Sequence, residues 1–420
     1  MSADSKQPQP PEDGAATTAD STSLLLSHAR LTDGRTVDVR LVGGRIEAVG
    51  TAGSLTAAGS RVDLAGYLLL PAAAEPHAHA DTALSADTPG PVSYAPEEVQ
   101  RRATEAALLQ LGHGATALRA HVRIGDVQGL GPLEAVLQAR RSLRGLADLT
   151  AVAVPRLLTG VAGADGLAML RDAVKMGAGV VGGCPDADPD PAGYVEAVLG
   201  VAAEHGVPVD LHTDGDDPAR LARLAAMAGG LRPGVTIGPC AGLGRLPSDA
   251  ASRAADRLAA AGVAVVCLPQ GGCGGTELRG AAPVRLLRAA GVRVAAGGGA
   301  LRDVANPVGR GDPLEAAYLL ASLGGLAPQE AYGAVSTEAR AVMGLPEVRV
   351  EAGFPAELLA VRGERLAGVL SLAYSRIVVH RGRVVARTSA VREYCDSAAA
   401  LDLPRQTRPE RPPEPGSPPA

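Results

Sequence analysis

Short apolar segments alternate with longer amphipathic segments through the middle of the chain, from about residue 68 to residue 344. The apolar segments are nearly continuous, as expected for parallel strands that are buried on both faces. Eight of them occur: one that ends at residue 79, then 115–121, 149–154, 179–183, 208–212, 234–238, 263–268 and 292–297. Helices are predicted between them at 95–111, 132–143, 166–175, 194–205, 218–228, 247–261 and 283–290. Eight strand–helix units in this order predict an α/β protein with a (β/α)8 TIM barrel.

The two ends of the chain have a different pattern. Strand-like runs separated by turn residues occur between residues 21 and 70, including a hairpin with the turn Gly43-Gly44, and again between residues 345 and 392. We expect these ends to meet in one small sheet domain beside a barrel formed by residues 71–344. Residues 1–20 and 393–420 are rich in polar residues and proline, and both are predicted to be disordered tails.

Composition excludes several classes of function. The chain has 420 residues, a formal net charge of −5 and a pI near 5.9, so nothing favours nucleic acid as a partner. No apolar run is long enough to span a membrane, and the N-terminus has no apolar signal segment. The five cysteines are odd in number and widely spaced, which is typical of reduced thiols. We therefore expect a cytoplasmic protein.

Histidines stand where the barrel would carry its chemistry, at the carboxyl ends of the strands. His77 and His79 are two residues apart, so they point the same way from a strand and form half of a metal site. His121 ends the second predicted strand and His212 the fifth. A pair of surface or hydrogen-bonded core histidines is the alternative for any one of these positions.

Four stretches carry a resemblance that covers residues 24–385: "EPHAHAD" at 75–81, "RAHV" at 119–122, "DLHTD" at 210–214 and "LRDVANPVGRGD" at 301–312. The chain resembles the cytosine deaminase branch of the amidohydrolase superfamily. That resemblance implies a barrel with a discontinuous β-sandwich domain, and one divalent metal, zinc or iron. It implies His77, His79 and His212 as metal ligands, with Arg119 and His121 as second-shell or substrate residues. The implied reaction is hydrolysis of a non-peptide C–N bond in a cytosine-like or cyclic amidine ring.

The sequence departs from the family pattern at four positions of the site. The proton-shuttle glutamate falls on Gly215, a histidine after the sixth strand on Pro239, the metal-binding aspartate on Gly299, and a substrate-binding glutamine on Arg156. Loss of a general acid or base typically slows a reaction by about 10²–10⁴. Asp214 and Asp303 are candidate substitutes, and three histidines with a water molecule are also a known zinc arrangement.

Two hypotheses follow from these departures. One is a hydrolase with impaired or altered activity that uses His77, His79 and His212, with Arg156 recognising an altered, acidic substrate. The other is a pseudoenzyme that serves as a binding or assembly module. A small cyclic amine or amide is the ligand implied by the resemblance, and because relatives often form oligomers, a homo-oligomer is a further expectation. Cys184, Cys240 and Cys273 follow barrel strands and are interpreted as a soft metal site or, preferably, as small apolar side chains.

Overall fold

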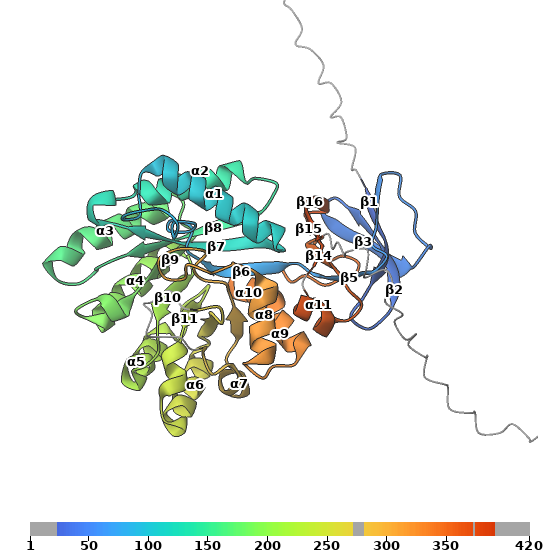
Figure 1. Cartoon of the computed structure of the whole chain (residues 1–420). Helices are drawn as coiled ribbons and strands as arrows, with labels where there is room; N and C mark the ends of the chain where they lie inside the picture. The colour runs from blue at the N-terminus through green and yellow to red at the C-terminus, as the bar shows by residue number, and fades with distance from the viewer. Residues whose placement is uncertain (1–22, 272–280, 373, 391–420) are drawn as a thin grey trace, which may run out of the picture. The chain divides into compact units, whose positions relative to one another are not determined.

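The computed structural model describes residues 23–271, 281–372 and 374–390. Eight parallel strands follow one another around a barrel in chain order, and their hydrogen-bonded sequence runs from β6 to β13 (Figure 1). An isolated parallel bridge between Ala78 and Gly299 brings the first strand to the segment after the last. The strands are β6 Ala73–Ala78, β7 Ala115–Ile124, β8 Asp148–Pro155, β9 Val180–Gly183, β10 Val209–Thr213, β11 Val235–Pro239, β12 Ala264–Cys267 and β13 Val294–Ala296. The predicted (β/α)8 barrel is confirmed.

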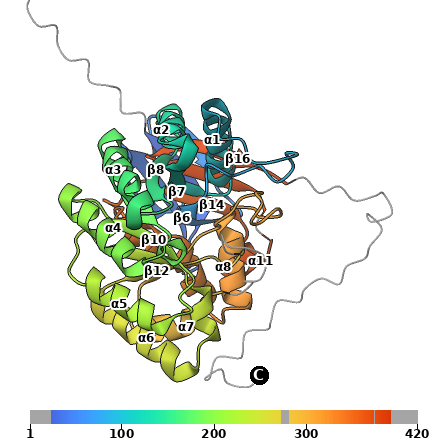
Figure 2. The same ribbon diagram turned by 90° about the vertical axis from the view of Figure 1, so that its left-hand side faces the viewer.

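Helices surround these strands, as Figure 2 shows. They are α1 Pro96–Gly112, α2 Gly131–Ser142, α3 Gly160–Met176, α4 Pro191–His205, α5 Pro218–Ala228, α6 Ser248–Ala261, α7 Val284–Ala289, α8 Pro313–Ser322, α9 Pro328–Val335 and α10 Thr337–Val342. Short 3-10 turns, η1 Asp126–Gln128, η2 Pro185–Ala187 and η3 Ala241–Arg245, follow β7, β9 and β11. Asp190, Asp217 and Asp312 cap α4, α5 and α8, and a proline follows each cap, which is the favoured N-terminal chemistry.

Strand β7 shows how the barrel separates two layers. Leu118, Ala120 and Val122 belong to the large apolar cluster that β7 shares with the surrounding helices. Ala117, one residue out of phase, belongs to a small cluster with residues of β6, β12 and β13. Because side chains alternate along a strand, Arg119 and His121 share the inner face with Ala117. Arg119 and His121 therefore lie inside the barrel.

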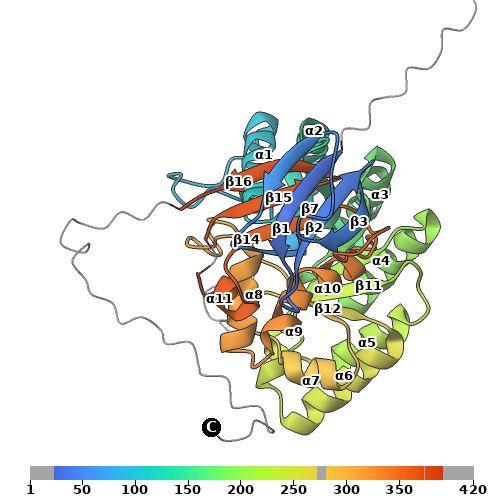
Figure 3. The same ribbon diagram turned by 90° about the vertical axis from the view of Figure 1, so that its right-hand side faces the viewer.

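A separate eight-stranded sheet combines both ends of the chain (Figure 3). Its order is β16-β15-β14-β5-β1-β2-β3, with β4 also beside β1. The bounds are β1 Leu24–Arg30, β2 Thr36–Val42, β3 Arg45–Thr51, β4 Ser60–Asp63, β5 Tyr67–Pro71, β14 Leu358–Arg362, β15 Arg376–His380 and β16 Arg383–Thr388, with α11 Leu366–Leu372 between β14 and β15. Antiparallel pairing of β5 with β14 joins the two ends, which confirms a discontinuous β domain.

The hairpin between β2 and β3 turns at Gly43 and Gly44, as predicted. Their φ angles of 56° and 77° lie in the left-handed region, where two successive glycines match the twist of the flanking strands. All eight strands of this domain are linked into one hydrogen-bonded sheet. The boundaries at residues 71 and 345 stay predictions, since the described residues from 23 to 388 belong to one compact unit.

The expected start of the central strand–helix pattern at about residue 68 needs correction, whereas the expected sheet domain of residues 21–70 already includes this run. The apolar run Leu68–Leu70 belongs to β5 of the separate sheet, where Leu69 pairs with Ala360. The barrel strand β6 begins only at Ala73. An apolar run alone does not identify which sheet a strand joins, because both sheets bury it. The predicted tails at 1–20 and 393–420, and Cys273, lie outside the described residues. No helix in the described ranges is long and apolar enough to cross a membrane.

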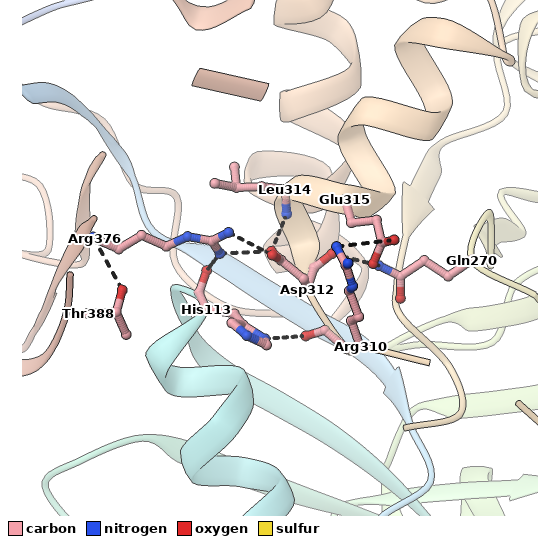
Figure 4. A network of polar contacts seen from close by, with 9 residues as sticks. His113, Gln270, Arg310, Asp312, Leu314, Glu315, Arg376 and Thr388 are labelled. Carbon is pink, nitrogen blue, oxygen red and sulfur yellow. Dashed lines mark hydrogen bonds and ion pairs between the residues drawn. The ribbon is translucent and has the colours of Figure 1, made fainter. Parts of the chain in front are cut away.

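A buried ion pair connects the sheet to the barrel (Figure 4). Arg376 at the start of β15 donates to Asp312, with Nη1 to Oδ1 at 2.8 Å and Nη2 to Oδ2 at 2.6 Å, and Nη1 also donates to the His113 carbonyl. Asp312 in turn accepts the N–H of Leu314 and caps α8. Gln270 Nε2 donates to the Asp312 carbonyl at 2.8 Å. Burial raises the pKa of Asp312, but the Arg376 hydrogen bonds outweigh it and hold that pKa below its usual value.

Replacing Arg376 with methionine is expected to lower the free energy of unfolding by about 3–5 kcal/mol, because the Asp312 carboxylate stays buried without its partner. Urea denaturation at pH 7 measures this loss. Arg349→Met provides the control, since Arg349 pairs with Glu347 on the surface and such pairs contribute about 0–1 kcal/mol. As the pH falls below about 4, the Asp312 carboxyl binds its proton, and the difference in unfolding free energy between the two variants should shrink. Equal stability of both variants at pH 7 would contradict the assignment.

Candidate metal centre

Four histidines converge at the carboxyl ends of the barrel strands. His77 lies in β6, His79 directly after it, His121 in β7 and His212 in β10. Ring centroids are 4.1 Å apart for His77 and His121, 4.5 Å for His77 and His212, and 4.6 Å for His121 and His212. One nitrogen from each of these three lies within 4.8 Å of the others. His79 Nε2 is 3.4 Å from His212 Nε2, so the fourth ring lies beside this group of three.

Strand alternation explains this convergence. His77 and His79 are two residues apart on one strand, and His121 and His212 stand two residues after Arg119 and Asp210 on their own strands. Each strand thus directs its last inward positions to the same end of the barrel. The three histidines expected from the resemblance are brought together. His121, expected beside them, lies inside the group of converging nitrogens.

The cluster is uncharged without a metal. Burial is the main cause that lowers the pKa of His79 to about 4 and that of His212 to about 3. Burial and then the neighbouring histidines place the pKa values of His77 and His121 well below the usual range. Neutral imidazole is the form that binds metal ions. At neutral pH these four rings therefore need not release protons before they bind a metal ion.

Unsatisfied nitrogens point to a missing partner in this cluster. Both ring nitrogens of His121 and Nδ1 of His212 are buried without a hydrogen bond from the described residues. His121 Nε2 lies 3.4 Å from Asp210 Oδ1. Buried polar atoms without partners are costly, and a cation would bind one nitrogen of each ring. Imidazole donors suit zinc and iron among the common divalent metals, so the residues fit the expected cofactor.

A buried ion pair supports the cluster from inside the barrel. Arg119 donates from Nη1 to Asp210 Oδ2 at 2.8 Å and from Nη2 to the Val342 carbonyl at 3.0 Å. Asp210 is fully buried, and its second oxygen is the one near His121. Arg119 was expected as a supporting residue, whereas Asp210 was not singled out. The signal available was an acidic residue within an apolar strand, two positions before His212.

Glu75 is a second supporting residue that the sequence reading did not single out. Its Oε1 accepts the N–H of His77 at 3.0 Å, and its Oε2 accepts the N–H of Gly298 at 2.7 Å. Burial raises the pKa of this carboxyl to about 7. A Cβ on Gly297 would lie only 2.4 Å from Glu75 Oε1, so glycine is required there. The sequence signal for this role was the position of Glu75 two residues before His77.

The expected substitute carboxylates are engaged elsewhere. Asp303 accepts from Thr82 Oγ1 at 2.9 Å and from two backbone N–H groups of its own loop. Asp214 accepts from Gly242 N at 3.0 Å and pairs with Arg245 at 2.7 Å. Neither belongs to the one converging group of ligand atoms in the described ranges.

The positions that depart from the family pattern lie around the cluster. Gly215 follows β10 with a φ of 73°, and Gly299 follows β13 with a φ of 67°. Pro239 ends β11. None of these residues has a side chain that can bind a metal or carry a proton. The site therefore consists of histidine nitrogens, with glycine and proline at the positions where the family pattern has an acid or a further histidine.

Arg156 and the cysteines lie apart from the histidine nitrogens. The Arg156 side chain is 72% exposed and contacts Asp126 at 3.5 Å, beside a depression of about 220 Å³ at the ends of β7 and β8. Cys184 is partly buried and Cys240 fully buried, and burial raises the pKa of both thiols. Raised thiol pKa values disfavour thiolate, which agrees with the apolar interpretation of these two cysteines.

The barrel mouth carries a further arginine that the sequence reading did not name. Arg123 is the exposed residue near the end of β7, two positions after His121. Its backbone N–H donates to Asp81 Oδ2 at 3.1 Å, and its Nη1 donates to the Tyr94 hydroxyl at 3.4 Å. Arg102 holds the same loop through the carbonyls of Asp81 and Ser93, each at 2.7 Å. The loop after β6 is thereby fixed against β7.

The sequence pattern of the Amidohydrolase family matches residues 95–386. Pterin deaminase from Rhizobium rhizogenes (strain K84 / ATCC BAA-868) is 26% identical over 385 residues, or 84% of this chain and 88% of that protein. The structure of N-isopropylammelide isopropylaminohydrolase from Burkholderia multivorans ATCC 17616 superposes with a TM-score of 0.78 at 27% identity, covering 88% of this chain and 100% of that one. A structure of 5-methylcytosine deaminase from Klebsiella pneumoniae has the same fold, with a TM-score of 0.76 at 24% identity and coverage of 89% and 100%. The match to the family pattern spans more than half of the chain, and the chain belongs to the amidohydrolase family.

Proposed function

We propose that this protein is a metal-dependent hydrolase that cleaves a non-peptide C–N bond of a small cyclic amine or amide. The observation that carries the proposal is the convergence of His77, His121 and His212 at the carboxyl end of the barrel, with His79 beside His212. The names of similar proteins describe removal of amino or alkylamino groups, from pterin, 5-methylcytosine and N-isopropylammelide. Family membership supports the reaction class, and the histidines could bind the metal ion that this reaction class uses.

The four histidines would hold one divalent cation, zinc or iron. Such a cation polarises water and lowers its pKa toward neutrality, which supplies the nucleophile for hydrolysis. Asp210 pairs with Arg119 and has its second oxygen 3.4 Å from His121 Nε2, so it would place a negative charge near the bound cation. Glu75 holds the backbone of His77 in place. His79 and His212 are the partly exposed members, so substrate would approach from their side.

Proton transfer is the weak step of this site. The family's shuttle position is Gly215, and Asp214 and Asp303 are bonded to other groups. We infer that the leaving amine receives its proton from solvent, and that turnover is lower by about 10²–10⁴ than with a positioned acid. The chain would then hydrolyse substrates with good leaving groups in preference to plain aromatic amines.

A second candidate function is a binding module that retains the metal and the fold without catalysis. Gly215, Pro239 and Gly299 favour it, since all three lack the side chain that the family uses for chemistry. The barrel mouth and the metal would then recognise a small ring compound without cleaving it. A homo-oligomer and a cytoplasmic location also stay predictions.

Purified protein is expected to contain about one equivalent of zinc or iron, which elemental analysis measures after growth with each metal. The double variant His77→Ala, His79→Ala should lose it, because half of the donor set is removed. His205→Ala is the matched control, as His205 lies at the C-terminal end of α4 and outside the converging group. Metal-free wild-type protein, after growth with either metal, would contradict the metal centre.

Restoring the acid tests the catalytic half of the proposal. Gly215→Glu is expected to raise the rate of ammonia release from ring amines by about 10² or more, because a carboxylate returns to the shuttle position. A Cβ there would meet Leu221 and Cys240 at 3.5–3.7 Å, which is ordinary contact, although the positive φ costs about 1–2 kcal/mol. Gly215→Gln carries the same shape without the acid. If metal is bound and both variants release no ammonia, the binding-module alternative holds.

A further inference from the structure

The structure assigns to Arg123 the recognition of an anionic group on the substrate, a step that rests on the proposed function and names the substrate class. The ligand of this site is then a small cyclic amine or amide that carries a carboxylate or a similar anion. Arg123 is no part of the histidine cluster, and the mechanism above does not use it.

The first argument is position. The inner face of β7 carries Arg119, His121 and Arg123 in alternate positions, and the outer face carries the apolar side chains that pack on the helices. Arg119 lies deep in the barrel, paired with Asp210, and His121 lies among the metal-binding rings. The next inward position is the first one above the cluster. It is also the only exposed residue of this strand, so Arg123 reaches the mouth through which a substrate enters.

The second argument is that the charge is available. The Arg123 side chain donates to the neutral hydroxyl of Tyr94, and no carboxylate in the described ranges forms an ion pair with it. Asp81 is nearby, but its carboxylate accepts the backbone N–H of Arg123 and is fully buried. The neighbouring Arg156 differs, since it contacts Asp126 at the mouth.

The third argument is that Arg123 is held in place. Its backbone is tied to Asp81, and the loop that carries Asp81 and Tyr94 is fixed by the buried Arg102. A preorganised guanidinium binds a carboxylate through two parallel hydrogen bonds. An anionic substituent on a ring that lies over the histidines would meet this group.

Binding of matched compounds to the metal-loaded protein tests the assignment. The pairs are cytosine with cytosine-5-carboxylate and pterin with pterin-6-carboxylate, measured by isothermal titration calorimetry. At least one carboxylate is expected to bind about tenfold to a hundredfold more tightly than its parent, which is the range of a charge-assisted hydrogen bond. Higher salt should reduce this preference.

Arg123→Gln should abolish the preference, while Arg123→Lys retains part of it and Arg156→Gln retains all of it. Equal affinity of wild-type protein for both members of each pair, no binding of either carboxylate, or an unchanged preference in Arg123→Gln would each overturn the assignment. Calorimetry needs no turnover, so arginine-dependent binding without ammonia release would contradict only the proposed hydrolysis. Ammonia release that is independent of Arg123 would contradict only the anion site.

Discussion

The closure of the barrel at β6 is the constraint on which the site depends. Strand β13 has only three residues, and one isolated bridge, from Ala78 to Gly299, extends the pairing toward the mouth. Glu75 reinforces this seam by accepting the N–H of His77 on one side and that of Gly298 on the other. The same carboxylate that closes the barrel therefore sets the backbone from which His77 projects. The glycines at 297–299 follow from this arrangement, because side chains there would displace Glu75 or the neighbouring loops.

A buried charge pair lies below that seam, and it makes the polar interior tolerable. Arg119 and Asp210 are both nearly inaccessible to solvent, and each satisfies the other at 2.8 Å. An isolated charge at either position would have a large desolvation cost. The attraction between the two charges, together with the hydrogen bond from Arg119 to the Val342 carbonyl, offsets part of that cost. The pair leaves one Asp210 oxygen directed at His121. A support for the candidate metal centre is thus also a structural element of the barrel core.

The sequence was sufficient for the parts of the molecule that depend on periodicity. The α5 range of 218–228 and the C-terminal ends of α4 and α6 were predicted to the residue, because Asp217 and Pro218 mark the start of α5 and a glycine follows the end of each helix. The expected start of the central pattern at residue 68 was wrong because an apolar run is compatible with either sheet. Asp210 and Glu75 were missed because their roles depend on partners 91 and 223 residues away. The engagement of Asp214 and Asp303 is likewise a matter of tertiary contacts.

The changes at the site have a common electrostatic direction. Glycine at positions 215 and 299 removes two negative charges that the family pattern places beside the metal, and the nearby Asp214 and Asp303 are neutralised or enclosed by other partners. The histidines carry no charge of their own at neutral pH. A bound cation would therefore be less compensated here than in a site with an aspartate ligand, and Arg123 adds a further positive charge at the mouth. Coulombic attraction in such a partly buried pocket favours a ligand that brings the missing negative charge with it. The negative charge of an anionic substrate would thus replace the charge of the acids that the family pattern has at positions 215 and 299.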